Sequence, residues 1–138
     1  MFKIQPVRSK ELQKNIADSL KCKFHENTYA FFAGELTSDA SEIAKIIAMC
    51  QFEYTPDYAS IKSLAIADGS EKDEAITILI RTVMNFCYRA GIPVIYFDEE
   101  SISEEYLRSI GFRNENHRWT INLKKFYVSP CRYNNEEN

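Results

Sequence analysis

The sequence predicts a single α+β domain, in which a mixed, mostly antiparallel twisted sheet is flanked by helices around one central α/β unit. Three observations support this fold class. Residues 29–67 carry short apolar or alternating runs typical of strands, whereas residues 71–90 repeat apolar side chains every three or four positions, as an amphipathic helix does. A second apolar run follows at residues 93–97. Because such connections are right-handed crossovers, the two strands that flank the helix are expected to be adjacent and parallel.

The first half of the chain reads as a strand, a helix and three further strands. Ser9 is a good N-cap, and Leu12, Ile16 and Leu20 then recur on one helical stripe. The third strand alternates between two faces along its whole length. The expected elements are a strand at residues 2–7, a helix at 10–21, and strands at 29–36, 43–54 and 58–67.

The second half reads as a long helix, a strand, a short helix and a hairpin. Gly91 is expected to end the long helix and Pro93 to prevent its continuation, and Gly111 is expected to end the short helix. The hairpin turn is expected at residues 114–116. The expected elements are a helix at residues 71–90, a strand at 93–97, a helix at 104–110 and a hairpin at 112–123.

Length and composition fit one folded domain. The chain has 138 residues, of which 45% are hydrophobic and 27% charged. A chain of this length buries roughly two-thirds of the surface that it exposes when unfolded. We expect a domain at residues 1–128 and a polar C-terminal tail at residues 129–138. The core is expected to include Phe31, Ile46, Leu64, Ile76, Leu79, Ile80, Val83, Ile95 and Phe112.

Charge and hydropathy exclude some classes of protein. The formal net charge of -3 and the lack of a basic run argue against a nucleic-acid-binding protein. The apolar stretches are too short to span a membrane, and the first residues lack the apolar core of a signal peptide. Four cysteines without paired spacing are typical of reduced thiols, so we expect a cytoplasmic protein.

Residues 64–80, LAIADGSEKDEAITILI, resemble the strand–turn–helix junction that binds the pyrophosphate of acetyl-coenzyme A in the GNAT superfamily of N-acetyltransferases. The family form is roughly L-x-V-x-P-x-x-R-G-x-G-I-G-x-x-L-L. The apolar frame matches at Leu64, Ile66, Leu79 and Ile80. The centre differs, because the residues that stand in place of Arg-Gly-x-Gly-Ile-Gly are Glu71, Lys72, Asp73, Glu74, Ala75 and Ile76.

Residues 100–112, ESISEEYLRSIGF, resemble a second motif of the same family, N-x-x-A-x-x-F-Y-x-x-x-G-F. Gly111 and Phe112 fit, and Tyr106 occupies the aromatic position. The family's tyrosine is often the proton donor to the departing thiolate, but its position holds Leu107, which cannot donate a proton. Tyr106 is therefore the candidate catalytic residue.

The resemblance implies a GNAT-like fold and an enzyme that uses acetyl-CoA to acetylate a small-molecule amine or a protein amino group. The sheet would be splayed between the strands at residues 58–67 and 93–97, and pantetheine would pair there with backbone near Leu64 and Ile66. The cofactor would be bound through the backbone of Leu64, Ile66, Glu71, Lys72, Asp73, Glu74, Ala75 and Ile76.

The changed loop leaves a second hypothesis open, a non-catalytic GNAT-like interaction or ligand-binding module that has lost coenzyme A binding and is often a homodimer. Glycines let backbone N–H groups approach phosphate oxygens at a helix N-terminus. Here the carboxylates of Glu71, Asp73 and Glu74 would oppose a pyrophosphate, and Lys72 offsets only part of their charge. Acidic residues also stabilise the first turn of a helix by roughly 0.3–1 kcal/mol each, so a helix start tuned for stability is the alternative.

Two other groups are weaker candidates. His25 lies three residues after Cys22, but two ligands do not make a zinc site, and a surface connector is the favoured interpretation. No metal site is predicted. Asp98, Glu99 and Glu100 follow an apolar strand and could hold either a general base for an amine or simply a solvated loop.

Overall fold

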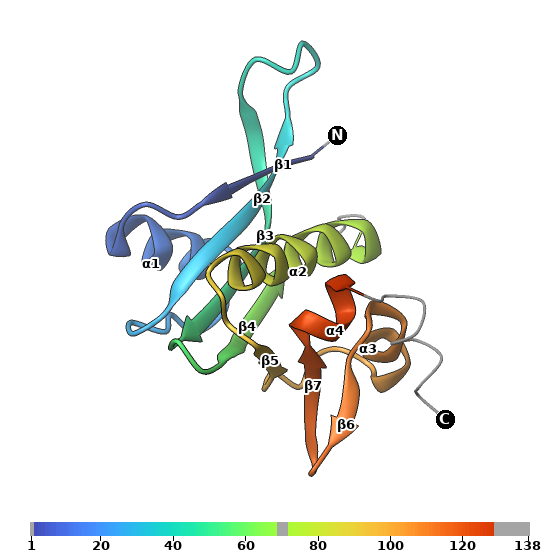
Figure 1. The fold of residues 1–138 in the computed structure, drawn as a ribbon. Helices are drawn as coiled ribbons and strands as arrows, with labels where there is room; N and C mark the ends of the chain where they lie inside the picture. The colour runs from blue at the N-terminus through green and yellow to red at the C-terminus, as the bar shows by residue number, and fades with distance from the viewer. Residues whose placement is uncertain (1, 69–71, 129–138) are drawn as a thin grey trace.

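The computed structural model describes residues 2–68 and 72–128 of the chain, so the expected tail at residues 129–138 lies outside the described residues. These residues form a seven-stranded sheet in the order β1-β2-β3-β4-β5-β7-β6, with four helices (Figure 1). The elements are β1 (Phe2–Pro6), α1 (Lys10–Ser19), β2 (Tyr29–Leu36), β3 (Ile43–Tyr54), β4 (Ala59–Ile66), α2 (Lys72–Arg89), β5 (Val94–Phe97), α3 (Glu104–Ile110), β6 (Arg113–Glu115), β7 (Arg118–Asn122) and α4 (Leu123–Val128).

The sheet is mixed and mostly antiparallel, as predicted. β4 and β5 pair in parallel, and α2 connects them, whereas all other neighbouring strands pair antiparallel. The prediction that these two strands are adjacent and parallel is therefore confirmed. The boundary between β4 and β5 divides the sheet into a large part, β1 to β4, and a small part formed by β5, β7 and β6.

The helices α1 and α2 cover opposite faces of the large part of the sheet (Figure 1). Successive residues of β3 alternate between them, because Met49 packs in the cluster under α1 while Ala48 and Cys50 pack in the cluster under α2. The predicted core is buried at Leu64, Ile76, Leu79, Ile80, Val83, Ile95 and Phe112. Phe31 and Ile46 are only partly buried and pack at the margins of the two clusters.

The buried face of α1 differs from the predicted stripe. Ser9 caps the helix as expected, with its hydroxyl oxygen accepting from the Leu12 amide at 3.0 Å. Leu12 itself is 37% exposed, whereas Gln13 is 2% exposed and faces the sheet together with Ile16 and Ala17. The helix turns a polar side chain inward because Gln13 donates there to Thr28 and Gln51.

The hairpin and the end of the domain also differ from the prediction. The turn lies at Asn116 and His117, which both have positive φ angles of 52° and 64°, and not at residues 114–116. The last strand is followed by α4, a helix that its short apolar pattern did not reveal. Gly111 has a φ of 130°, and a Cβ atom there would lie 2.8 Å from Phe126 of α4. Glycine at this position therefore allows α4 to pack against the end of α3.

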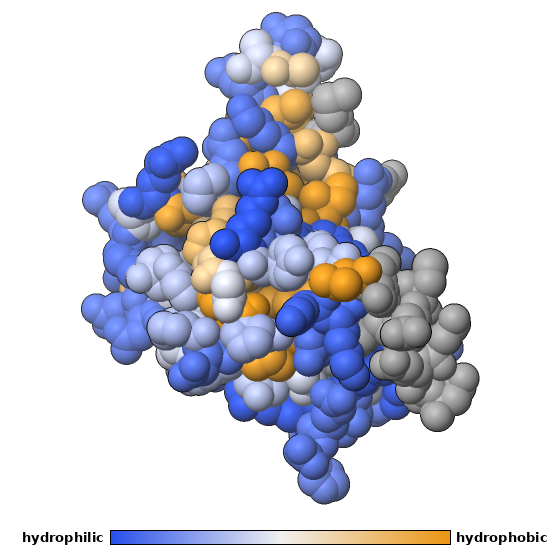
Figure 2. Space-filling view, in the orientation of Figure 1, coloured by the Kyte–Doolittle hydropathy of each residue, from blue (hydrophilic) through white to orange (hydrophobic). Residues whose placement is uncertain are grey.

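The surface is mostly polar on the side seen in Figure 2, with hydrophobic residues in separate patches. Among the described residues, the exposed large hydrophobic side chains are spread over α1, β2, α2 and α4, as in many folded domains. None of the described helices is long and apolar enough to cross a membrane.

Candidate functional site

The sheet opens between β4 and β5. Their parallel register covers three pairs and ends at Ile61 and Phe97. The Asp98 amide then donates to the Ile61 carbonyl oxygen at 3.0 Å. β4 continues to Ile66 beside β3, whereas β5 ends at Phe97. Residues 62–66 of β4 therefore extend beyond the last register pair with β5.

A β-bulge lies at the same place on β4. Ile61 pairs with Phe52 of β3 and Ser63 pairs with Gln51, so Lys62 is the extra residue on β4. A bulge bends its strand and increases the local twist. The bend coincides with the point at which β4 leaves β5, and it explains locally why the two strands diverge.

A cavity of about 350 Å³ lies between the end of β4, the first turns of α2 and the segment that leads into α3. The predicted site residues Leu64, Ile66, Asp73, Ile76 and Tyr106 all belong to its lining. The other lining residues are Ser101, Ile102 and Ser103. The fold thus brings together residues from both motifs that the sequence singled out.

The other predicted site residues take different positions. Glu74 is exposed on the first turn of α2, and Ala75 is fully buried under the helix. Lys72 begins α2, and Glu71 lies outside the described residues. Ile76 has two roles, because it borders the cavity and is also a core residue with 5% exposure.

Tyr106 links α3 to the first turns of α2. Its hydroxyl donates to the main-chain oxygen of Asp73 at 2.6 Å and also contacts the hydroxyl of Thr77. Its amide is capped by the Ser103 side chain at 3.2 Å, so Ser103 is the N-cap of this helix. Leu107, in the position of the family's tyrosine, is 2% exposed and packs in the core.

The lining fits the two parts of an acetyl-CoA molecule differently. Leu64, Ile66, Ile76 and Ile102 offer an apolar surface beside β4, suitable for an uncharged arm. Among the described residues, the lining includes no lysine or arginine but does include Asp73. The cavity therefore suits an uncharged pantetheine arm better than a pyrophosphate, which a nearby acidic residue would repel.

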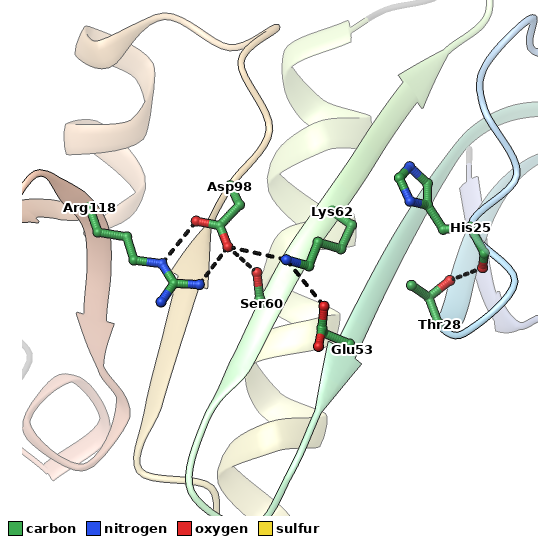
Figure 3. A network of polar contacts seen from close by, with 7 residues as sticks. All are labelled: His25, Thr28, Glu53, Ser60, Lys62, Asp98 and Arg118. Atoms are coloured by element: carbon green, nitrogen blue, oxygen red, sulfur yellow. Dashed lines mark hydrogen bonds and ion pairs between the residues drawn. The ribbon is translucent and has the colours of Figure 1, made fainter.

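Asp98 lies at the centre of a polar network on the sheet (Figure 3). Arg118 of β7 donates to both of its carboxylate oxygens, at 3.0 and 2.6 Å, and the Ser60 hydroxyl donates to one of them. Lys62 lies 3.5 Å from the same carboxylate and 3.1 Å from Glu53. The hydrogen bond from Arg118 is the main cause that lowers the pKa of Asp98 to about 2. Asp98 is therefore ionised at neutral pH and is a poor general base.

Glu99 and Glu100 border a second cavity of about 380 Å³ between the end of β5, α3 and β7. Leu107 and Trp119 supply apolar parts of its lining. One Glu99 carboxylate oxygen accepts from the Ser101 amide at 2.9 Å. Asp98 and Arg118 border the same cavity, and the three acidic residues differ in their contacts: Asp98 is ion-paired with Arg118, whereas Glu99 accepts from Ser101.

A buried polar network fixes the connector between α1 and β2. Gln51 is 0% exposed and accepts from the Gln13 side chain at 2.8 Å and from the His25 amide at 2.9 Å. Its own amide group donates to the Lys23 carbonyl oxygen at 2.8 Å, and Gln13 donates to the Thr28 hydroxyl at 2.9 Å. The sequence did not indicate this network, because neither glutamine stands in a recognisable motif.

His25 lies on this connector and borders a third cavity with Glu53 and Lys62. Burial lowers its pKa below the ordinary value, and the charges of Lys23 and Lys62 lower it further. In the part of the chain that the structure describes, no three His, Cys, Asp or Glu side chains form a group that could hold a metal ion.

The sequence matches no family model and no curated protein. Several solved structures have a similar fold. Mutant forms of the spermidine/spermine N-acetyltransferase SpeG from Vibrio cholerae align over 93% of this chain and 98% of theirs, with a TM-score of 0.65 and 12% identity. The N-acetyltransferase from Staphylococcus aureus Mu50 aligns over 90% of this chain and 99% of its own, with a TM-score of 0.63 and 12% identity.

The IAA acetyltransferase from Bacillus cereus ATCC 14579 aligns over 88% of this chain and 99% of its own, with a TM-score of 0.62 and 14% identity. These identities are low, so the likeness concerns the fold. The chain has the mixed α/β fold of the GNAT acetyltransferases, as the two sequence motifs predicted.

Proposed function

We propose that this protein is an acetyl-CoA-dependent N-acetyltransferase acting on a small-molecule amine or a protein amino group. The observation that supports the proposal most is the divergence of β4 from β5 beside a cavity lined by residues of both motifs. The GNAT-like fold agrees with the proposal, and one protein of similar fold is a spermidine/spermine N-acetyltransferase, whose named substrates are amines. The free thiols of Cys22, Cys50 and Cys87 support a reducing compartment such as the cytoplasm.

In this proposal, residues 62–66 of β4 hold the pantetheine arm through backbone hydrogen bonds, as an added strand would. Leu64, Ile66 and Ile76 exclude water from the arm. Backbone N–H groups near the bulge orient the reacting carbonyl and stabilise negative charge on its oxygen. Acetyl-CoA would supply the acetyl group as a thioester. Tyr106 is the candidate proton donor, because it lines the cavity and carries a hydroxyl group.

The pyrophosphate would meet the first turn of α2 through the backbone of residues 72–76. Glu99 and Glu100 are the candidates for a base that accepts a proton from the amine, because they border the neighbouring cavity, where the third carboxylate, Asp98, is held by Arg118. An ammonium acceptor must lose a proton before it attacks, so a carboxylate in this place has a chemical use.

Calorimetric titration with acetyl-CoA is the direct test. We expect measurable binding with a dissociation constant weaker than about 100 µM, because carboxylates at the start of α2 oppose the pyrophosphate. At an effective dielectric of about 20, two unit charges about 6 Å apart interact by roughly 3 kcal/mol, and half of that is about tenfold in affinity. The absence of heat at millimolar acetyl-CoA would contradict the proposal. A low-micromolar constant would show that the backbone binds phosphate without the family's glycines.

The Asp73→Asn variant tests the electrostatic part of this argument. Asp73 lines the cavity, so removing its charge is expected to tighten acetyl-CoA binding by up to about tenfold. Glu74→Gln is the matched control, because Glu74 is an exposed carboxylate of the same turn outside the lining. Equal effects of the two substitutions would mean that general charge, and not a pyrophosphate beside Asp73, sets the affinity.

A non-catalytic GNAT-like module, with or without a homodimer, is the second candidate function. The observation that favours it is the state of α3, where Leu107 is buried and the Tyr106 hydroxyl already bonds to Asp73 and Thr77. The two candidates differ in turnover. Release of free coenzyme A from acetyl-CoA, measured with a panel of amines and an amine-free control, supports the enzyme. The absence of both acetyl-CoA binding and amine-dependent release supports the module, which in this hypothesis has lost coenzyme A binding.

A further inference from the structure

The boundary between the two parts of the sheet has little pairing of its own. β4 and β5 share three register pairs, whereas the registers on either side, β3 with β4 and β5 with β7, are longer. We call this boundary the seam; it comprises residues 59–61 of β4, residues 95–97 of β5, and Asp98, which follows β5. A short parallel ladder adds little stability, so other contacts must hold the seam in register.

Asp98 supplies such contacts from the end of the seam. Its amide donates to Ile61, and its carboxylate accepts from Ser60 on β4 and from Arg118 on β7. Lys62, the bulge residue, lies 3.5 Å from the same carboxylate. One side chain thus connects β4, β5 and β7 at the point where β4 and β5 diverge, as Figure 3 shows.

The geometry of this contact differs from that of an ordinary surface ion pair. The Asp98 side chain is 23% exposed and that of Arg118 is 41% exposed, and Arg118 donates two hydrogen bonds to Asp98 in the fork geometry. The Arg118 guanidinium also lies 3.7 Å from the ring centroid of Tyr96, which holds it in place. Isolated exposed pairs contribute little, whereas paired, partly buried and stacked groups hold their geometry.

We propose that Asp98 is a positioning residue whose carboxylate fixes where β4 leaves β5 and thereby sets the width of the opening beside the cavity. The inference rests on the proposed function only for what the opening binds. The strand junction itself is a property of the fold, so it can be tested without acetyl-CoA.

The first test is amide hydrogen exchange, followed by NMR, in the Asp98→Asn variant of the full chain. Loss of the charged hydrogen bonds is expected to speed exchange of the seam amides by about 10- to 100-fold, while amides of the β2–β3 pair keep their rates. Glu53→Gln is the matched control, because it removes a contact of Lys62 and leaves every Asp98 contact in place. Seam exchange no faster in Asp98→Asn than in this control would overturn the proposal.

Asp98→Asn could unfold the whole domain, in which case all amides would exchange faster. The Arg118→Lys variant then decides whether the contact holds the seam, because lysine keeps the positive charge but cannot form the bidentate hydrogen bonds to the Asp98 carboxylate. Local acceleration at the seam supports the proposal, and unchanged exchange there overturns it. Asp98→Glu keeps the charge and is expected to restore part of the protection that Asp98→Asn loses.

Acetyl-CoA affinity is the second readout. If the unmodified protein does not bind acetyl-CoA, the proposed function fails, and the exchange experiment still decides the role of Asp98. If it binds, Asp98→Asn is expected to weaken the affinity about tenfold or more, with Glu53→Gln unchanged. Unaltered affinity together with a faster-exchanging seam would overturn the claim that Asp98 sets the opening for the ligand.

Discussion

Tyr106→Phe is expected to lower the turnover of acetyl-CoA by roughly 10²–10⁴, the range for the loss of a general acid. Tyr106 lines the cavity beside the opening of the sheet. Phenylalanine keeps the aromatic ring but lacks the hydroxyl group that would donate the proton. The measurement is the initial rate of coenzyme A release with an amine acceptor, with kcat and KM determined separately. Loss of the proton donor is expected to lower kcat, whereas KM is expected to change little.

Tyr88→Phe is the control for this experiment, because Tyr88 is a partly exposed tyrosine on α2 outside the cavity lining. The structural role of Tyr106 gives a second, separate effect. Removing the hydrogen bond to Asp73 is expected to lower the free energy of unfolding by about 0.5–1.5 kcal/mol. Lower stability with an unchanged rate would leave Tyr106 as a link between α3 and α2 and exclude it as the donor, since a thiolate can also leave without one.

Phe52→Ala is expected to lower the free energy of unfolding by about 3–5 kcal/mol, the range for a buried phenylalanine. Phe52 is 1% exposed and lies at the centre of an aromatic cluster under α2. Its ring centroid is 5.9 Å from that of Phe31, 5.7 Å from that of Phe86 and 6.1 Å from that of Tyr54. The substitution removes these ring contacts and leaves a cavity between β3 and α2. Urea unfolding followed by fluorescence or circular dichroism measures the effect.

Tyr29→Ala provides the comparison, because Tyr29 belongs to the same cluster but is 57% exposed. Its loss is expected to lower the free energy of unfolding by about 1 kcal/mol or less. Similar effects of the two substitutions would mean that the cluster collapses around the space left by Phe52 and that its packing is not the main support of α2.

Much of the fold could be predicted from residue patterns alone. The bounds of β2, β3 and α3 match the predicted ranges, and α2 and β5 begin and end within a residue or two of theirs. These elements have long or strongly periodic apolar patterns, or end at a glycine with a positive φ angle such as Gly91. The two motifs also indicated which segments meet, because Leu64, Ile66, Asp73 and Ile76 of the first motif and Tyr106 of the second line one cavity.

The errors lie where a local pattern competes with contacts from distant segments. Leu12 looked like a core residue, but Gln13 is buried instead because Gln51 and Thr28 satisfy its side chain. The turn between β6 and β7 was misplaced because residues 114–116 are all compatible with a turn, and strand register selected Asn116 and His117. The helix α4 is too short for its periodicity to be read before its packing against Gly111 is known.

Local periodicity and chain connection were enough to predict the order of the elements up to β7 and the crossover from β4 to β5, and the residue types at the start of α2 are read directly. Three-dimensional packing was needed to show that Ile76 is part of the core as well as the cavity lining, and that Tyr106 bonds to Asp73. It also decided that Asp98 pairs with Arg118, which is possible because β7 lies beside β5. Partners twenty or more residues apart become neighbours only through strand pairing and the packing of helices, and no local pattern encodes which side chains these bring together.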